Sequence, residues 1–130
     1  MIEFLVSVLI FAFGMLGLIG MQTKTLGYSQ SSLYRSQATA LADDVLDRMR
    51  ADRSNARLGS WDTPIGERAA SVSGSSLSKT DLADWKGQVE RLLPSGKASV
   101  GFAAATGVVS VSIEWSERGQ PVAFPTNSAL

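Results

Sequence analysis

The chain begins with an uninterrupted apolar run. Residues 4–21 carry no charge, and Ser7 is the one polar side chain among them. Two further uncharged residues extend the run to Thr23, and at about 1.5 Å per residue a helix of this length spans roughly 30 Å, the hydrocarbon thickness of a bilayer. A helix in the core of a small soluble domain would show a polar face, and this segment shows none. Residues 1–23 are therefore predicted to form a membrane-inserted helix.

A cleavable secretory signal is the main alternative for this segment. Such a signal has a basic flank before its apolar run and an Ala-x-Ala exit after it. Here the flank formed by residues 1–3 is acidic, and no Ala-x-Ala follows Met21. These two departures favour the membrane-inserted helix over the signal.

Glu3 lies at the start of the apolar run, and two interpretations of it stay open. A carboxylate at the end of an apolar helix costs less than one at the bilayer centre, and the helix dipole favours an anion at the N-terminus. Glu3 can therefore be a charge at the level of the lipid headgroups. It can equally be the buried partner of a cation from another chain.

Three glycines recur at a spacing of three within the apolar run, at Gly14, Gly17 and Gly20. Small residues permit close packing of helices in a membrane, although this spacing is not that of GxxxG. Glycine also weakens a helix by about 1 kcal/mol relative to alanine, so these residues are candidates for a stretch that unwinds when its surroundings change. Packing and unwinding both remain open.

The helical pattern continues beyond the apolar run, because no proline occurs in residues 1–60. One helix is predicted from about residue 2 to about residue 53, with residues 24–57 forming the amphipathic half of this N-terminal region. Its apolar stripe consists of Leu26, Leu33, Ala38, Leu41, Val45, Leu46 and Met49.

Charged residues on the polar side of this segment have the spacing of ion pairs. Asp44 and Arg48 are four residues apart, and Asp47 and Arg50 are three apart. Both spacings bring side chains together on a helix surface. A solvated helix face is therefore preferred over a metal site for these carboxylates and for Asp43.

The remaining residues, 58–130, are predicted to form a small globular part of the chain, the head. Residues 58–79 are rich in Gly, Ser and Pro and lack a period, so a long loop is expected there, of the kind that is functional or mobile. A short helix is predicted from Thr80 to the Leu93-Pro94-Ser95-Gly96 segment, followed by a hairpin that turns at residues 105–107 and an edge strand at 121–125. The expected inward positions are Leu82, Trp85, Val89 and Leu92 on the helix, Val100, Phe102 and Ala104 on the first strand, and Val109, Val111, Ile113 and Trp115 on the second.

The expected fold class is α+β. A long N-terminal helix, with a transmembrane half and an amphipathic half, packs against a small antiparallel sheet of about three strands. Because a head of this size is marginal on its own, the amphipathic half must supply one wall of its core.

The composition excludes several kinds of catalytic, metal-binding and nucleic-acid-binding site. The chain has 12 Lys+Arg and 12 Asp+Glu, for a formal net charge of zero, so nucleic acid is not an expected partner. It contains no Cys and no His, which excludes thiolate nucleophiles, Cys/His zinc sites and imidazole bases. Residues 76–79 match S-x-x-K but lack the companion motifs of that enzyme class. We expect neither an enzyme nor a cofactor, metal or small-molecule substrate.

The N-terminal run Met1-Ile2-Glu3-Phe4-Leu5-Val6, followed by the apolar helix, resembles the type IV pilin family, which includes the pseudopilins of type II secretion. It is similar to the mature N-terminus that prepilin peptidase leaves. Within the family the resemblance is to PilV-type minor pilins, and it covers most of the chain. The residues that carry it are Gly14-Met15-Leu16-Gly17-Leu18, Gln22, Arg35-Ser36-Gln37-Ala38, residues 41–44 and 46–50, Trp85, residues 92–96, and the strand from Val111 to Trp115.

This resemblance implies a structural subunit that helps to prime pilus assembly in a tip complex. Its implied partners are other minor pilins and the major pilin, with prepilin peptidase for processing. Glu3 is implied to neutralise the N-terminal amine of a neighbouring subunit as subunits leave the bilayer. The exposed loop and sheet edges of the head would make the subunit contacts. The implied location is the bacterial inner membrane, with the head in the periplasm, and then the pilus tip at the cell surface.

The chain departs from the family pattern in three ways. The family glutamate is normally the fifth residue after cleavage, so two residues, including the usually N-methylated first one, are expected before Met1. Many relatives close their C-terminal region with a disulfide, which this chain cannot form. Major pilins commonly carry proline where Gly20 stands, so unwinding here would depend on glycine.

Three other functions are alternatives to a minor pilin. The nearest alternative is a minor pseudopilin of a type II secretion system, which genomic neighbours would distinguish. A second is a single-pass, membrane-anchored binding module that never leaves the bilayer. The last is an anchored enzyme, which the missing Cys and His disfavour.

Overall fold

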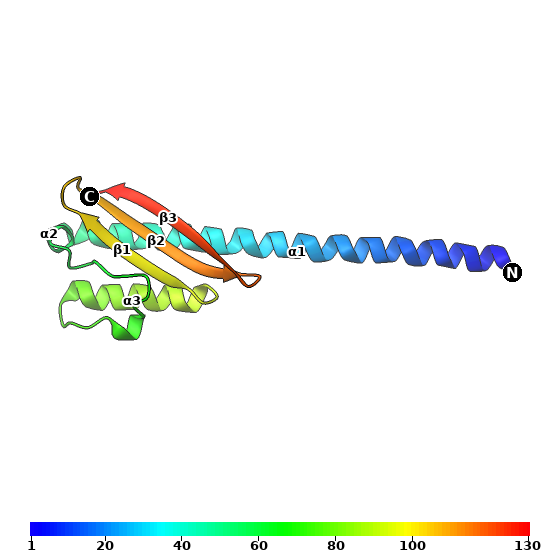
Figure 1. Cartoon of the computed structure of the whole chain (residues 1–130), viewed down its shortest axis with the longest axis horizontal. Coiled ribbons are helices and arrows are strands. Elements are labelled where there is room, and N and C mark those ends of the chain that lie inside the picture. The colour runs from blue at the N-terminus through cyan, green and yellow to red at the C-terminus, as the bar shows by residue number, and fades with distance from the viewer. The chain divides into compact units, whose positions relative to one another are not determined.

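The computed structural model describes residues 1–25 and 27–130, with a helical backbone through residue 26. The chain divides into two units, Met1–Leu33 and Tyr34–Leu130. In chain order the elements are α1 (Ile2–Ala51), α2 (Arg53–Arg57), the 3-10 helix η1 (Ala69–Ser71), α3 (Leu77–Leu92), β1 (Lys97–Ala103), β2 (Val108–Glu117) and β3 (Gln120–Ala129) (Figure 1).

The predicted long helix is confirmed. The helix α1 is continuous from Ile2 to Ala51 and ends where Asp52 leaves the helical backbone conformation, with a ψ of 47°. It contains an 18-residue window with a mean hydropathy of 2.5, and by length and composition it can cross a membrane.

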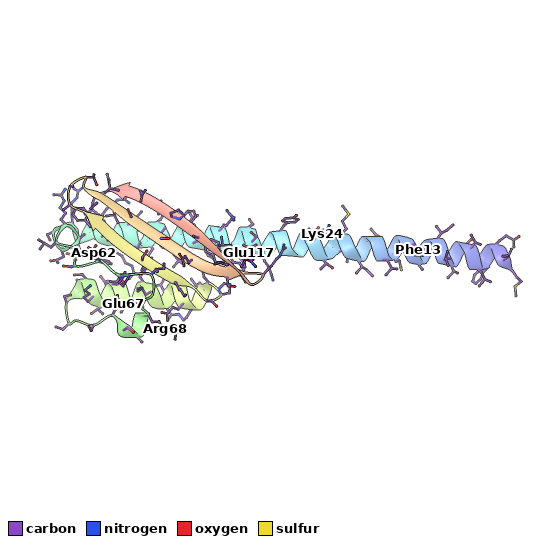
Figure 2. All side chains as sticks on the ribbon, viewed as in Figure 1. Phe13, Lys24, Asp62, Glu67, Arg68 and Glu117 are labelled. Atoms are coloured by element: carbon purple, nitrogen blue, oxygen red, sulfur yellow. The ribbon has the colours of Figure 1, made fainter. Side chains whose placement is uncertain are left out.

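The first unit consists of the helical residues 1–33. The large apolar side chains from Ile2 to Met21 have exposed fractions between 50% and 72%. Figure 2 shows these side chains, Phe13 among them, projecting from the ribbon on both sides. None of them is covered by the described part of the chain, so this unit has no core of its own.

The second unit contains the core, and the second half of α1 forms one wall of it. The predicted stripe is confirmed from residue 38 onward, where its members are at most 5% exposed. Leu33 was wrongly predicted to belong to it, since it is 54% exposed and ends the first unit, whereas Tyr34 packs against the core. Leu26 lies outside the described residues. The buried residues of α1 are Ala38, Leu41, Ala42, Val45, Leu46 and Met49.

The helix α3 begins earlier than predicted. It starts at Leu77 rather than Thr80, because Ser76 is the N-cap and its side chain accepts a hydrogen bond from the Lys79 N–H at 3.4 Å. The serine of the S-x-x-K match is therefore a helix cap.

The inward face of α3 was predicted correctly except at its C-terminal end. Leu82, Trp85 and Val89 are at most 1% exposed. The prediction that Leu92 faces inward was wrong, since Leu92 is 48% exposed while Leu93 is buried. The helix ends at Leu92, and Leu93 adopts an extended backbone (φ −114°, ψ 135°) that turns its side chain inward.

Residues 58–79 are not a simple loop. Trp61 is fully buried, Thr63 is 4% exposed, and Thr63 forms an isolated antiparallel bridge with Val100 of β1. Both Thr63–Val100 backbone hydrogen bonds are made, at 2.9 and 3.1 Å. Residues 61–63 therefore belong to the core and to the edge of the sheet, whereas residues 64–77 are exposed or half-buried.

The sheet is antiparallel with the order β1-β2-β3. The predicted inward positions of the second strand, from Val109 to Trp115, are all buried. The prediction for Ala104 was wrong, because β1 ends at Ala103 and Ala104 is exposed in the turn. The buried residues of β1 are Val100, as predicted, and Ala98. The predicted edge strand is confirmed but is longer, since β3 pairs with β2 along its whole length from residue 120 to 129.

The turn between β2 and β3 allows their pairing to begin directly beside it. Its two central residues, Arg118 and Gly119, have positive φ values of 53° and 79°. A two-residue turn of this kind matches the right-handed twist of the flanking strands, so pairing begins at once between Glu117 and Gln120.

We predict that the α1 wall determines the stability of the second unit. Met49→Ala should lower the free energy of unfolding by about 2–5 kcal/mol, because it leaves a cavity in the core. Leu33→Ala removes an exposed side chain from the same helix and should change it by less than about 0.5 kcal/mol. Denaturant titration of the full chain in detergent measures both, and equal losses would contradict the assignment of the core.

Candidate functional site

The first candidate site is the start of α1. Glu3 lies in the first helical turn, with its Oε2 atom 3.3 Å from the Met1 amino nitrogen, and Ser7 Oγ donates a hydrogen bond to the Glu3 carbonyl at 2.8 Å. The Glu3 side chain is 86% exposed. No described residue buries this carboxylate, so whatever surrounds it comes from outside the chain. Lipid headgroups and another chain, the two interpretations of Glu3, both meet that requirement.

The three glycines of the apolar run lie inside continuous helix. A Cβ atom added at Gly14, Gly17 or Gly20 would meet no heavy atom within 4 Å. These glycines therefore leave room on a helix surface that the described chain does not fill. Close packing of another helix and unwinding both remain predictions for them.

The charged residues on the polar side of α1 form ion pairs within the helix and with α3. Both predicted pairs are confirmed, with Arg48 and Asp44 at 3.0 Å and Arg50 and Asp47 at 2.7 Å. Arg48 also lies 3.5 Å from the Asp84 carboxylate of α3. Burial opposes the guanidinium charge, but the hydrogen bond and charge of Asp44, with the charge of Asp84, raise the pKa of Arg48. Arg48 thereby joins α1 to α3.

The two edges of the sheet differ in their ability to accept another strand. The outer edge of β1 is closed by the Thr63–Val100 bridge and by Asp62, whose Oδ1 accepts the Phe102 N–H at 2.9 Å. The outer edge of β3 has no strand beside it among the described residues. Pro121 and Pro125 lie on that outward side, and each removes one N–H donor from the edge. Within the described part of the chain, β3 is therefore the sheet edge left for a subunit contact, and its outward N–H donors are few.

The second candidate site lies around Lys86 and was missed in the sequence. Lys86 is 2% exposed on the inner side of α3. Its position gives a signal, because 86 is four residues after Leu82 and three before Val89, on the apolar face of the helix. A lysine at such a position must be either solvated or hydrogen-bonded by the protein.

A short polar network holds the Lys86 ammonium. Its Nζ donates hydrogen bonds to Thr63 Oγ1 at 2.6 Å and to the Pro64 carbonyl at 3.2 Å. Thr63 Oγ1 in turn donates to Glu67 Oε2 at 2.6 Å. Burial lowers the pKa of Lys86, while the charges of Glu67 and Glu90 oppose this shift. The buried cation is thus satisfied by the segment that bridges to β1.

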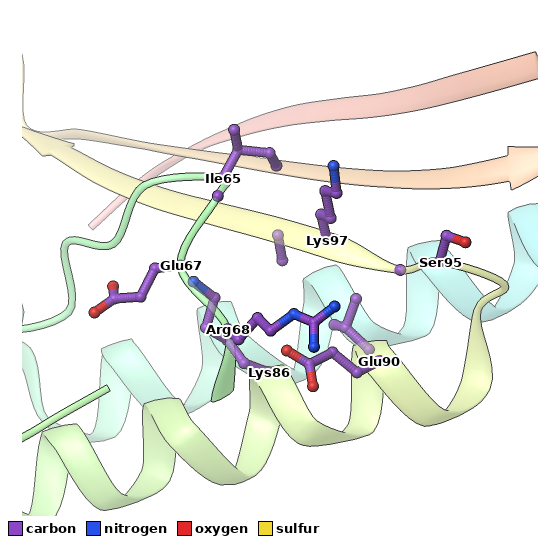
Figure 3. A pocket seen from close by; sticks show the side chains of 11 residues that line it. Ile65, Glu67, Arg68, Lys86, Glu90, Ser95 and Lys97 are labelled. Atoms are coloured by element: carbon purple, nitrogen blue, oxygen red, sulfur yellow. The ribbon is translucent and has the colours of Figure 1, made fainter. Parts of the chain in front are cut away.

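A cavity of about 330 Å³ opens beside this network. Figure 3 shows charged side chains from residues 67–68, from α3 and from the start of β1 around it. Its lining residues are Ile65, Gly66, Glu67, Arg68, Lys86, Val89, Glu90, Ser95, Gly96, Lys97 and Ala98.

Comparison of the chain with family models, curated proteins and solved structures yields no match. The function is therefore inferred from the exposed apolar helix and from Glu3.

We predict that Lys86 makes the stability of the second unit depend on pH in the alkaline range. Its folded-state pKa lies below the ordinary value of 10.5, so on raising the pH the folded state releases this proton before the unfolded state does. The free energy of unfolding therefore gains a favourable contribution as the pH passes the folded pKa and approaches 10.5.

Lys86→Met removes this contribution and leaves the other titrating groups in place. The difference in unfolding free energy between wild type and Lys86→Met should shift in favour of wild type as the pH rises from neutrality toward 10.5. Denaturant titration at a series of pH values measures this difference. A difference that stays constant would show that Lys86 titrates alike in both states.

Proposed function

We propose that the chain is a minor pilin, a structural subunit that helps to prime type IV pilus assembly in a tip complex with other minor pilins. The observation that supports the proposal is the exposed apolar surface of the first unit, with a single carboxylate at its start. Between Ile2 and Met21 its large apolar side chains are at least half exposed, and its one carboxylate, Glu3, stands in the first turn. Such a helix requires an apolar environment for its side chains and a polar or charged partner for its carboxylate.

Lipid provides the apolar environment, and a bundle of similar helices can replace it. A helix that is apolar all round is stable in a bilayer or buried among other helices, and it is not stable in water. A filament subunit passes from the one environment to the other. The second unit contains a complete core within Tyr34–Leu130, so it needs no change in its own packing when the helix changes surroundings.

Glu3 supplies the selectivity of this transfer in the proposal. A charge at the bilayer centre costs about 2.5–3.5 kcal/mol, and an unpaired charge among packed apolar helices is also unfavourable. The amine of a neighbouring subunit would neutralise it, so that docking with the correct partner removes the cost. Gly14, Gly17 and Gly20 would permit close packing or local unwinding as the helix enters the filament.

The same proposal places the chain in two compartments in turn. Before assembly it resides in the bacterial inner membrane with its head in the periplasm, and after assembly it lies at the pilus tip. The other minor pilins and the major pilin are its partners, and prepilin peptidase processes it. The head contributes its exposed surfaces, including the β3 edge, to the tip complex.

Glu3→Ala should reduce surface piliation strongly while membrane insertion persists, because the substitution removes the charge and leaves the apolar run intact. Pili are counted by electron microscopy, and the chain is followed in the membrane fraction by immunoblot. Asp43→Ala is the matched control, since Asp43 is an exposed carboxylate of the same helix. Unchanged piliation in Glu3→Ala cells would rule out the assembly role of Glu3.

A tip subunit should also leave the cell with the pilus. Sheared and purified pili should contain the chain at a low ratio to the major pilin, measured by quantitative mass spectrometry, and immunogold labelling should mark filament ends. A chain confined to the membrane fraction of piliated cells would instead indicate an anchored binding module.

A further inference from the structure

The cavity beside Lys86 is formed by three segments that are distant in the sequence. Residues 65–68 form one side, Lys86, Val89 and Glu90 of α3 form another, and residues 95–98 close it. Figure 3 shows Arg68, Lys86, Glu90 and Lys97 around this space. Its volume of about 330 Å³ is at the lower end of the range for small-ligand pockets. A side chain or a small organic acid fits this volume, and a nucleotide-sized ligand does not.

One oxygen of each carboxylate in the cavity is engaged by the chain itself. Glu67 Oε2 accepts the Thr63 hydroxyl at 2.6 Å, and Glu90 Oε1 accepts the Ala69 N–H at 2.9 Å. Each carboxylate thus fixes the segment between the Thr63 bridge and η1. Their structural role accounts for their presence beside a cavity.

The donor groups, in contrast, are largely unengaged. Among the described residues neither the Arg68 guanidinium nor the Lys97 ammonium has a hydrogen bond or ion pair, and both side chains are exposed. The Lys86 ammonium has three protons and two acceptors, Thr63 Oγ1 and the Pro64 carbonyl. Arg68 and Lys97 therefore present donors that have no partner among the described residues, and the three cations of the cavity outnumber its two carboxylates.

We propose that this cavity binds a carboxylate group, with Arg68 and Lys97 as its direct ligands and Lys86 as the buried cation behind them. Arginine offers a planar pair of donors that matches a carboxylate, and lysine adds a second charge from the opposite side. The carboxylate comes either from a small dicarboxylic acid or from an acidic side chain of another protein. The chemistry is the same in both cases, and the site does not depend on pilus assembly.

The test uses the full ¹⁵N-labelled chain in zwitterionic detergent micelles, observed by amide chemical shifts. One titration uses succinate and a second uses N-acetylglutamate α-amide, each against sodium chloride at equal ionic strength. Saturable shifts are expected at Gly66, Arg68, Gly96 and Lys97, which line the cavity. Tighter binding of succinate would assign a free dicarboxylate, and tighter binding of the capped glutamate would assign a protein side chain.

Two variants and a control distinguish a specific binding site from nonspecific attraction of anions. Arg68→Gln and Lys97→Gln should each weaken binding of the tighter probe about tenfold or more, because each removes a charged hydrogen-bond donor. Arg53→Gln removes the same charge from α2, outside the cavity, and should leave the affinity unchanged.

Because Arg68 and Lys97 are exposed, their substitution leaves the core intact, and the spectra of the free variants verify the fold. Shifts no larger than those caused by sodium chloride, or equal weakening by Arg53→Gln, would overturn the proposal. Either result would leave the assembly role of Glu3 untouched, since binding is measured on the isolated chain.

Discussion

The second unit depends on burial of one face of α1 between residues 38 and 49. A sheet of three strands has one apolar face and needs another element to cover it. Ala38, Val45 and Met49 are fully buried, and the Trp85 Nε1–H donates to the Leu41 carbonyl at 2.8 Å, which ties α3 to the same helix. Both α3 and the sheet therefore share a wall with the helix whose first half is apolar all round.

The buried Lys86 connects three features of this unit. Its hydrogen bonds to Thr63 Oγ1 and the Pro64 carbonyl hold a segment that would otherwise be loop. Held in this place, Thr63 bridges to Val100 and closes the outer edge of β1. Lys86 also lines the cavity that Arg68 and Lys97 border. A lysine in the core is thus compatible with stability because its hydrogen bonds replace water and also order the chain around it.

Predictions from the sequence succeeded where the structure follows local periodicity. The α1 ion pairs and the inward residues of β2 follow from spacings of three or four in a helix and two in a strand. The failures at Leu33, Leu92 and Ala104 all lie where an element or a unit ends, because periodicity does not show where the neighbouring wall stops. Thr63 was missed for another reason, since its partners are Lys86 and Val100, which lie far along the chain.

By itself the sequence determined the long helix, the apolar surface of its first half with Glu3 at the start, and the absence of Cys and His chemistry. These are properties of neighbouring residues in one chain, so they need no knowledge of tertiary contacts. Only the tertiary structure decided that Lys86 is buried, that one sheet edge is closed, and that Arg68 and Lys97 border one cavity. The physical reason is that a buried charge and a cavity are defined by groups from several elements, whose distances are set by packing.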